Sequence, residues 1–406
     1  MISCGCLWST YPPVWRVFSI IFVYLFRKKV FVIYRKNKNV DNRAYKFRLY
    51  PNAAQTVLIN KTFGCVRFVY NHLLHDKQVY YKATGMTLKK NVSEYKKVFS
   101  FLSEVDSLAL ANAKVNLETA FRNFFDKRAK FPSFHKKGHN DSYTTNNVNN
   151  NIEIVQHGIK LPKLGVVKAK LHRTIGKNEI IKSCTISRVA DRYYVSIITE
   201  LDKVEAPKVD PKTISEDKVI GCDFSVPHFM VDDKNNIYEY PKYYRQSEKK
   251  LKKEQKKLSR KVYRSANYYK QLKVVQKLHA KVRNQRMDFL HKLSKYLVEH
   301  YDILCFEDLN LAELKQSMRF GKSISDEGFG FFRVFVQYKA ERAGKHFVKT
   351  NKWFASTKTC CNCGYKNDDI TLNTREWDCP DCKTHHDRDH NAAINIKNEG
   401  WRIALA

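Results

Sequence analysis

The first half of the chain opens with a strand pattern followed by two helix patterns. From residue 44 to residue 50, apolar side chains alternate with mostly basic ones, which indicates a half-buried strand ending at Pro51. Apolar residues then recur at helical spacing over residues 58–73 and again over residues 110–124. We therefore expect one strand and two amphipathic helices in this region.

Strand patterns return after the second helix. Residues 140–151 are rich in asparagine and predict a loop. Short apolar runs at 181–186 and 193–198 flank turn residues at 190–192, which predicts a β-hairpin. This half therefore indicates an α+β unit, a sheet with inserted helices, that ends in a linker at 201–218.

The second half alternates buried strands with helices, the order typical of an α/β unit. Apolar runs at 219–223 and 303–307 predict buried strands, and each ends in an acidic residue. Residues 233–236 predict a turn within a hairpin. Helical periodicity from 242 to 297, broken near 265–267, predicts two helices. The remaining predicted elements are a helix at 331–343, a strand at 345–354 and a short helix at 392–396.

The charge of the chain narrows the class of its partners. The sequence contains 74 Lys and Arg against 40 Asp and Glu, a formal net charge of +34. Such a chain repels itself unless a polyanion is bound, so nucleic acid is the leading partner and an anionic membrane surface is second. Residues 242–286 carry 17 Lys and Arg and only two acids, which predicts a nucleic-acid-binding face.

Four of the 11 cysteines form two close pairs. Cys360 and Cys363 are followed, after 15 residues, by Cys379 and Cys382, the spacing of a zinc ribbon. Soft thiolates select Zn²⁺ over Mg²⁺. Four thiolates leave no open position on the ion, so we expect a structural zinc site.

Other residues near these pairs are expected to contribute less. Cys361 is an alternative to Cys360, but Cys360 gives the usual two-residue spacing. His385 and His386 are alternative ligands, although the four thiols suffice and we expect both histidines at the surface. The remaining cysteines are scattered and the total is odd, which argues against a secreted disulfide framework and favours an intracellular protein with reduced thiols.

The first 42 residues differ from the rest of the chain. Their apolar patches at 17–26 and 30–34 are separated by basic residues, so neither approaches the roughly 20 apolar residues that a membrane helix needs. No small-residue cleavage site of a signal peptide is evident. We favour a leader appended to the folded protein, with no stable membrane association, over a membrane anchor.

Three acidic residues are candidates for a second, catalytic metal site. Asp223 and Glu307 end apolar strands and Asp389 opens a helix, so a mixed α/β sheet can bring all three together. Buried carboxylates are costly unless paired or metal-bound, and oxygen ligands suit Mg²⁺. Two Mg²⁺ ions about 4 Å apart can support phosphodiester cleavage. Asp308 and Asp387 are alternatives that spacing does not exclude, and any single acid is more simply a cap or a surface residue.

At these residues the chain resembles the TnpB family of transposon-encoded, RNA-guided DNA nucleases, which are related to compact type V CRISPR effectors. The resemblance extends over about residues 43–400 and rests on many short motifs in the family's order. The matching segments are 44–51, 60–65, 67–71, 130–134, 159–163, 258–261, 284–286, 288–293, 306–310, 339–341, 356–360 and 386–393.

The resemblance implies a multidomain fold. Residues 43–210 would form a wedge-like β-barrel with a helical recognition insertion at about 53–140. Residues 216–354 and 385–406 would form a RuvC nuclease domain of the RNase H type. The zinc ribbon, at 355–384, would interrupt this nuclease domain, and the leader lies outside the resemblance.

The resemblance also implies the catalytic residues and the partners. The three catalytic acids of the family fall on Asp223, Glu307 and Asp389, which selects Asp389 over Asp387. The guide RNA would come from the transposon end, base pairing would read the target DNA, and the protein would read backbone shape and a short adjacent motif. Ser225 stands where the family usually has glycine, which adds a side chain at a position where an unusual backbone angle is possible.

Three functions are therefore compared. The first is an RNA-guided DNA endonuclease that hydrolyses phosphodiesters with two Mg²⁺ ions. The second is a non-cleaving, nucleic-acid-binding accessory protein of transposition, in which Ser225 marks decay of the site. The third is a transposase that acts without guide RNA.

Overall fold

The alternating run near residue 44 forms the first strand of the computed structural model. The structure describes residues 40–138, 140–202, 206–225, 227–310, 326–371 and 373–406. Strand β1 (Val40–Tyr50) begins four residues before the predicted strand, so it includes Val40 to Asn42 of the expected leader. The rest of that leader lies outside the described residues. None of the helices in the described segments has the length and apolar character that crossing a membrane requires.

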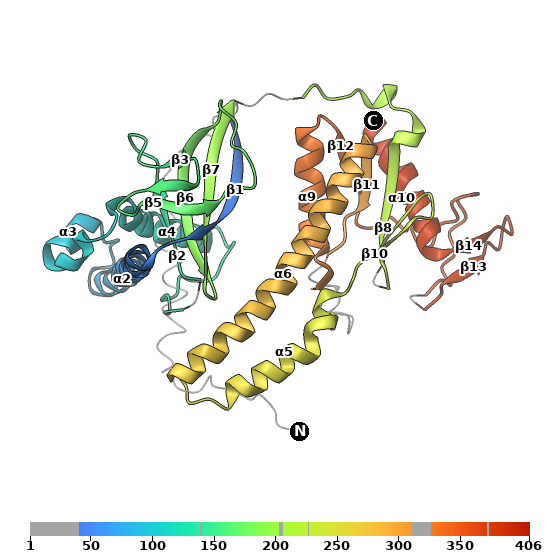
Figure 1. The fold of residues 1–406 in the computed structure, drawn as a ribbon. Coiled ribbons are helices and arrows are strands. Elements are labelled where there is room, and N and C mark those ends of the chain that lie inside the picture. Colours follow the sequence, from blue (N-terminus) through green and yellow to red (C-terminus); the bar gives the residue numbers. More distant parts are fainter. Residues whose placement is uncertain (1–39, 139, 203–205, 226, 311–325, 372) are drawn as a thin grey trace. The chain divides into compact units, whose positions relative to one another are not determined.

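The described residues form two units, one up to residue 202 and one from residue 206. The first unit contains a seven-stranded antiparallel sheet of strand order β2-β6-β7-β1-β5-β4-β3 (Figure 1). The predicted hairpin is present as β6 and β7, joined by a tight turn at Ala190 and Asp191. The strands besides β1 are β2 (Ser142–Asn146), β3 (Glu153–Val155), β4 (Gly158–Leu161), β5 (Gly165–Lys170), β6 (Ile180–Val189) and β7 (Arg192–Asp202).

Strand β2 lies inside the segment that was predicted to be a loop, so that prediction is wrong for residues 142–146. Tyr143 and Thr145 alternate inward and are buried, while the hydroxyls of Thr144 and Thr185 lie 2.7 Å apart across the β2–β6 pair. The surrounding asparagines hid this short alternation, because they dominate the composition of the window.

Helices of the first unit lie between β1 and β2 in sequence, as predicted. Helix α2 (Ala53–Thr84) begins at a capping box in which Asn52 and Gln55 bond each other's backbone, and it ends at Gly85 in the left-handed conformation. The other helices are α3 (Val92–Val98), the 3₁₀ turn η1 (Ser100–Ser103) and α4 (Ser107–Phe125). Their apolar faces and the inner face of the sheet form one buried core.

The second unit is built on a five-stranded mixed sheet of order β10-β9-β8-β11-β12. Strands β8, β11 and β12 are parallel, whereas β9 and β10 form the predicted hairpin and run antiparallel to their neighbours. The bounds are β8 (Val219–Phe224), β9 (Phe229–Asp232), β10 (Ile237–Glu239), β11 (Ile303–Glu307) and β12 (His346–Thr350). The predicted linker contains two 3₁₀ turns, η2 (Pro211–Thr213) and η3 (Glu216–Lys218), just before β8.

Helices cover both faces of this sheet. Residues Cys222 and Phe306 point to one face, where they pack with α6 (Ala266–His300) and α9 (Phe329–Arg342). Residues Val219, Ile303 and Cys305 point to the other face, where they pack with α10 (Arg388–Leu405) (Figure 1). Because side chains alternate along a strand, the faces to which these residues point also determine to which face the residues at the strand ends point.

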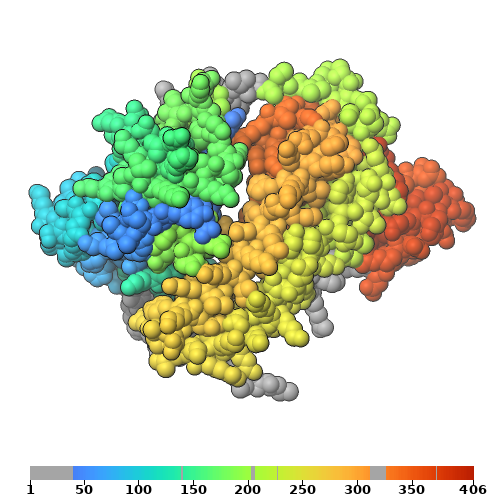
Figure 2. Space-filling model, viewed as in Figure 1, coloured from blue at the N-terminus to red at the C-terminus, as the bar shows by residue number. Residues whose placement is uncertain are grey.

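The basic segment forms a helical hairpin of α5 (Tyr243–Ser259) and α6. The break between the two helices lies at residues 260–265, slightly before the predicted break at 265–267, since residues 266 and 267 already belong to α6. Ser265 caps α6 by accepting a hydrogen bond from the Tyr268 amide at 3.1 Å. Glu254 ties the helices together through Gln271, whose Nε2 donates to its carboxylate at 2.7 Å. Figure 2 shows this hairpin, in yellow to light orange, open on the face in view.

A buried acid at the start of α9 gives a stability prediction. Glu327 is 1% exposed, and its Oε2 has no hydrogen-bond partner among the described residues. Burial, and then the charge of Asp326, raises the pKa of Glu327 from 4.5 to about 8. The folded protein therefore keeps a proton that the unfolded chain releases, so stability falls as pH rises from about 4.5 to about 8.

Replacing Glu327 by glutamine should remove this dependence, because the amide keeps the shape without the charge. We expect the Glu327→Gln variant to melt at least about 3 °C above the wild type at pH 9 and at nearly the same temperature at pH 5. Thermal unfolding of both proteins over this pH range measures the difference. If the melting temperatures of the two proteins changed with pH in the same way, Glu327 would not be the source of the pH dependence.

Candidate functional site

Two of the predicted acids lie side by side at one edge of the second sheet. Strands β8 and β11 are parallel, and Cys222 pairs with Phe306 in their register, so Asp223 and Glu307 are the next residues on each strand. Asp223 lies two residues after Gly221, and Glu307 lies two residues after Cys305. Residues two apart on a strand share a face, so both acids point to the face that α10 covers. Asp223 is only 6% exposed.

Helix α10 brings the third acid to the same edge. Two glycine contacts allow its close approach: a Cβ on Gly221 would lie 2.2 Å from the Ala393 carbonyl oxygen, and one on Gly400 would lie 2.4 Å from the Cys305 sulfur. The helix begins at Arg388 and runs for 18 residues, so the prediction of a short helix after Asp389 is wrong. Asp389 therefore lies in its first turn.

The structure gives the neighbouring acids other roles. Asp387 is the N-cap of α10, and its Oδ1 accepts a hydrogen bond from the His390 amide at 2.8 Å. Asp308 makes ion pairs with Arg333 at 3.3 Å and with Lys349 at 3.1 Å. Both of these acids are therefore engaged by groups outside the set of Asp223, Glu307 and Asp389.

Hydrogen bonds hold the Asp389 carboxylate in place. Arg388 donates to Oδ1 from Nε at 3.0 Å and from Nη2 at 2.8 Å. The Ser225 hydroxyl donates to Oδ2 at 2.8 Å, and Arg375 lies 3.7 Å from the same oxygen. Ser225 has no left-handed backbone angle, so its side chain is accommodated without strain at this position.

The charges of Asp389 and Glu307 act on the buried Asp223. Burial raises the pKa of Asp223 well above its usual range, and the charges of Asp389 and then Glu307 raise it further. Burial alone raises the pKa of Glu307 to about 7. This repulsion is relieved either by protons or by a cation, and carboxylate oxygens suit Mg²⁺. The residues therefore fit a divalent ion, although only the four cysteines, among the described residues, bring such ligand atoms within 4.8 Å of one another.

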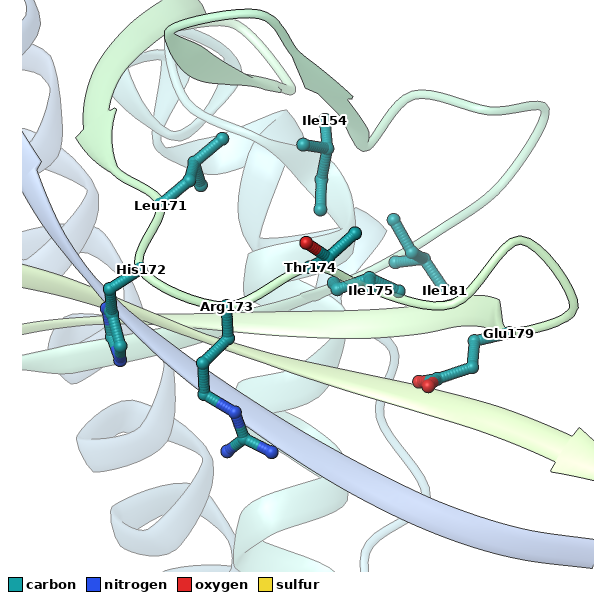
Figure 3. Close-up of a pocket in the computed structure, with 8 residues that line it drawn as sticks. All are labelled: Ile154, Leu171, His172, Arg173, Thr174, Ile175, Glu179 and Ile181. Atoms are coloured by element: carbon teal, nitrogen blue, oxygen red, sulfur yellow. The ribbon is translucent and has the colours of Figure 1, made fainter.

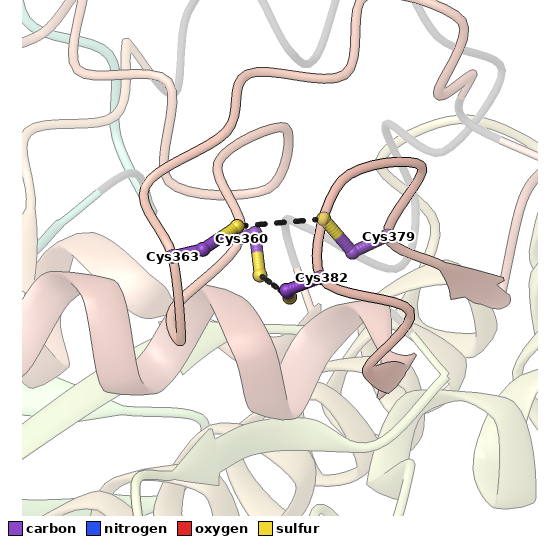
Figure 4. Close-up of side chains that lie close together, drawn as sticks. All are labelled: Cys360, Cys363, Cys379 and Cys382. Carbon is purple, nitrogen blue, oxygen red and sulfur yellow. Dashed lines mark hydrogen bonds between the residues drawn. The ribbon is translucent and has the colours of Figure 1, made fainter.

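The four predicted cysteines converge on one point (Figure 4). The sulfur atoms of Cys360 and Cys382 lie 3.6 Å apart, as do those of Cys363 and Cys379. A tetrahedral zinc ion with Zn–S bonds of about 2.3 Å separates its ligands by about 3.8 Å, so the arrangement fits a closed zinc ribbon. The hydroxyl and the amide of Thr384 hold the pKa of Cys382 below its usual value.

One of the two histidines is not at the surface, contrary to expectation. His386 lies on β14 (His385–Asp387), pairs with Trp377 on β13 (Glu376–Asp378), and is buried. Its Nε2 lies 3.1 Å from the Cys360 sulfur, so it supports the thiolate set from outside. Successive side chains of a strand point to opposite faces, which explains why His386 is buried while the neighbouring His385 points outward and bonds Asp378.

Two asparagines, which sequence analysis did not single out, attach the ribbon to α10. Asn395 donates to the carbonyl oxygens of Ser356 at 2.8 Å and Thr359 at 2.6 Å, and Asn391 also donates to Thr359 at 2.8 Å. The Asn391 side chain accepts from the Cys361 amide at 2.9 Å. Both asparagines are buried, Asn391 two residues and Asn395 six residues after Asp389. Their spacing of four residues places both on one face of a helix, and this was the signal from which a shared contact could have been predicted.

The first unit contains a separate cavity of about 570 Å³ (Figure 3). Its carboxylate, Glu179, accepts bonds from Tyr45 at 2.7 Å, Thr199 at 2.5 Å and Arg43 at 3.3 Å. The Arg173 guanidinium lies 4.9 Å from the Tyr45 ring. Because the only lining acid is already bonded, we assign no reaction to this cavity. It is lined by Ile154, Leu171, His172, Arg173, Thr174, Ile175, Glu179 and Ile181.

Models of three protein families match the chain. One described as "Probable transposase" matches residues 197–318, and a Cas12f1-like TNB domain matches residues 329–396, which include the ribbon. A model described as a helix-turn-helix domain matches residues 41–86. The structure forms that last segment as strand β1 and helix α2.

Curated relatives match over most of the chain. A protein of Streptomyces pristinaespiralis named "Putative RNA-guided DNA endonuclease" is 33% identical over 88% of this chain and 89% of its own length. InsQ of Escherichia coli, which bears the same designation, is 28% identical over 89% of this chain and 93% of its own length.

One solved structure is similar in fold. It is the Cas12f1 protein in a cryo-EM structure of a Cas12f1–sgRNA–target DNA complex. The TM-score is 0.53 at 12% identity, and the match covers 89% of this chain and 99% of that chain.

Proposed function

This chain belongs to the TnpB family, and from that premise we propose that it is an RNA-guided, metal-dependent DNA endonuclease. The observation that carries the proposal is the meeting of Asp223, Glu307 and Asp389 at one edge of the second sheet. The strand order and the helix on each face fit a RuvC domain of the RNase H type at 216–354 and 385–406.

The remaining domain assignments follow the same proposal. The seven-stranded sheet at 43–210 corresponds to the wedge-like β-barrel of the family, with the helices at about 53–140 as the recognition insertion. Residues 355–384 would be the inserted zinc ribbon, in which the four clustered cysteines would hold zinc as a structural ion.

In the proposed reaction Asp223, Glu307 and Asp389 would hold two Mg²⁺ ions. When bound, these ions would supply an activated water and neutralise charge on the leaving oxygen. Asp223 and Glu307 contribute oxygens from adjacent strand ends, where partial burial strengthens their interaction with a cation. Arg388 and Ser225 fix the direction in which Asp389 presents its carboxylate. The expected products carry 5′-phosphate and 3′-hydroxyl ends.

The basic helical hairpin is proposed to bind nucleic-acid backbone. The α5–α6 segment contains most of the 17 Lys and Arg at 242–286, and few of its side chains are buried. Phosphate contacts by such residues carry no sequence information and weaken with salt. They suit a heteroduplex of DNA and a guide RNA from the transposon end, in which base pairing reads the target.

The full-length protein, expressed together with the DNA that flanks its gene, tests this function. We expect a discrete RNA to co-purify, and the complex to cut DNA that matches the variable end of that RNA in Mg²⁺ but not in EDTA. DNA with a scrambled target is the control. Specific binding without cutting in Mg²⁺ or Mn²⁺ would favour the non-cleaving accessory protein. Strand transfer in the absence of any RNA would favour a transposase.

The contact between Ser225 and Asp389 gives a smaller prediction for activity. Removing the hydroxyl in Ser225→Ala should free one carboxylate oxygen and lower the cleavage rate about tenfold, because supporting hydrogen bonds orient metal ligands. Rates measured over a Mg²⁺ titration check this. A Ser225→Gly variant should behave like Ser225→Ala, and unchanged rates in both would show that the Ser225 hydroxyl does not orient Asp389.

A further inference from the structure

An exposed tryptophan stands at the same sheet edge as the three acids. Trp353 is 83% exposed. It follows β12, whose last residue, Thr350, pairs with Glu307 in the parallel register. Trp353 is the third residue after Thr350, which limits the distance between their Cα atoms to about 11 Å. That span corresponds to about three nucleotides of a stacked strand.

Ordered backbone holds this tryptophan in place from both sides. On one side, the Trp353 amide donates to Asn351 Oδ1 at 2.9 Å, and the Phe354 amide donates to the Asn351 carbonyl at 3.0 Å. On the other side, Asn395 of α10 holds the carbonyl of Ser356 at 2.8 Å. An aromatic ring on a fixed segment loses little conformational freedom when it binds a partner.

A positive charge accompanies the ring. Lys352 Nζ lies 4.8 Å from the centroid of the Trp353 ring. Single exposed apolar side chains are common and usually need no explanation. This one differs because it combines a rigid support, a neighbouring cation and a position three residues after Thr350, the residue that pairs with Glu307. A π-face next to a cation is the combination that binds a nucleobase and its phosphate.

We propose that Trp353 is a stacking platform for one unpaired base of the DNA strand that is cut. This subsite rests on the proposed nuclease function and adds to it a residue, Trp353, that binds the substrate strand. A base inside a duplex is already stacked on both faces, so the indole is able to take only a base that has left the helix. Stacking there would bring phosphodiesters a few nucleotides further along the same strand toward the strand ends that carry Asp223 and Glu307.

The test uses the full-length protein with its co-purified RNA and an Asp223→Asn substitution that blocks cutting. The probe is a short single-stranded oligodeoxythymidylate that carries one 2-aminopurine at successive positions. We expect 2-aminopurine fluorescence to be quenched at one or two adjacent positions, and Trp353→Ala to abolish that quenching. Affinity for the probe should fall about 5- to 150-fold. Trp353→Phe should restore most of both signals, which a merely structural role would not explain.

A matched control is Tyr365→Ala, which truncates another exposed ring of the second unit, 43% exposed, on the ribbon. It should leave the quenching at those positions intact. Quenching that persists in Trp353→Ala, or that Tyr365→Ala removes equally, would overturn the subsite. The two proposals can fail separately. If the protein cuts guided DNA but Trp353 does not quench the probe, only the subsite is wrong. If Trp353 quenches the probe but the wild-type protein does not cut, only the nuclease function is wrong.

Discussion

Replacing Asp223 by asparagine should reduce DNA cleavage by at least about 10³-fold, which corresponds to roughly 4 kcal/mol of transition-state stabilisation. The amide keeps the shape of the side chain but removes the charge at the centre of the three acids, where burial and the charges of Asp389 and Glu307 already raise the pKa of Asp223. Cleavage of matched DNA under single-turnover conditions measures the loss.

The same substitution should make the protein more stable in the absence of metal. Asp223 is buried beside two other carboxylates, so a neutral amide removes an unfavourable charge. We expect the melting temperature of the metal-free variant to rise by about 2–4 °C. Added Mg²⁺ should stabilise the wild type more than the variant. A variant that loses activity and also stability would point to misfolding instead of a missing ligand.

Asp308→Asn is the matched control, because it also replaces a carboxylate by an amide, at the residue next to Glu307. Asp308 is engaged with Arg333 and Lys349, outside the shared edge. It should cut within about threefold of the wild type, since partly exposed ion pairs contribute little. If Asp223→Asn cut DNA at the wild-type rate, or if both variants lost activity equally, Asp223 would not be a catalytic residue.

Periodicity predicted most of the second unit because each buried strand is a short apolar run between helices. The runs ending at Asp223 and Glu307 appear as β8 and β11, and the break near residue 265 separates α5 from α6. The two acids could therefore be predicted to lie at strand ends. Their adjacency could not, because it depends on a parallel register between residues more than eighty positions apart.

The parts that sequence analysis missed depend on tertiary contacts. Asp387 and Asp389 are alike in sequence, and only the resemblance separated them. The structure adds the physical reason, because one caps α10 and the other accepts from Ser225. His386 becomes buried because the β13–β14 pair turns it toward Cys360. Asn395 gains its role only when α10 meets the segment before the ribbon.

Removing one zinc ligand should unfold the ribbon while leaving the rest of the second unit folded. The buried core of the ribbon consists of only four residues, Cys360, Ile370, Trp377 and Cys379, and two of these are ligands. So small a core does not hold a chain segment together without metal or a cross-link. In Cys379→Ser we expect zinc content to fall from one ion per chain to nearly none and residues 355–384 to become sensitive to protease.

Cleavage by Cys379→Ser should fall by at least about 10²-fold, although the ribbon contributes no carboxylate. The ribbon segment is bonded to α10 through Asn391, and α10 carries Asp389 at its start, so a loose ribbon lets this acid move. Cys361→Ser is the control: its sulfur lies outside the four-thiol group, so zinc content and cleavage should stay close to those of the wild type. Metal analysis, limited proteolysis and guided cleavage of the same preparations separate the outcomes. If Cys379→Ser loses zinc but cuts normally, the ribbon does not position Asp389, whereas retention of zinc would show that the cysteines are not its ligands.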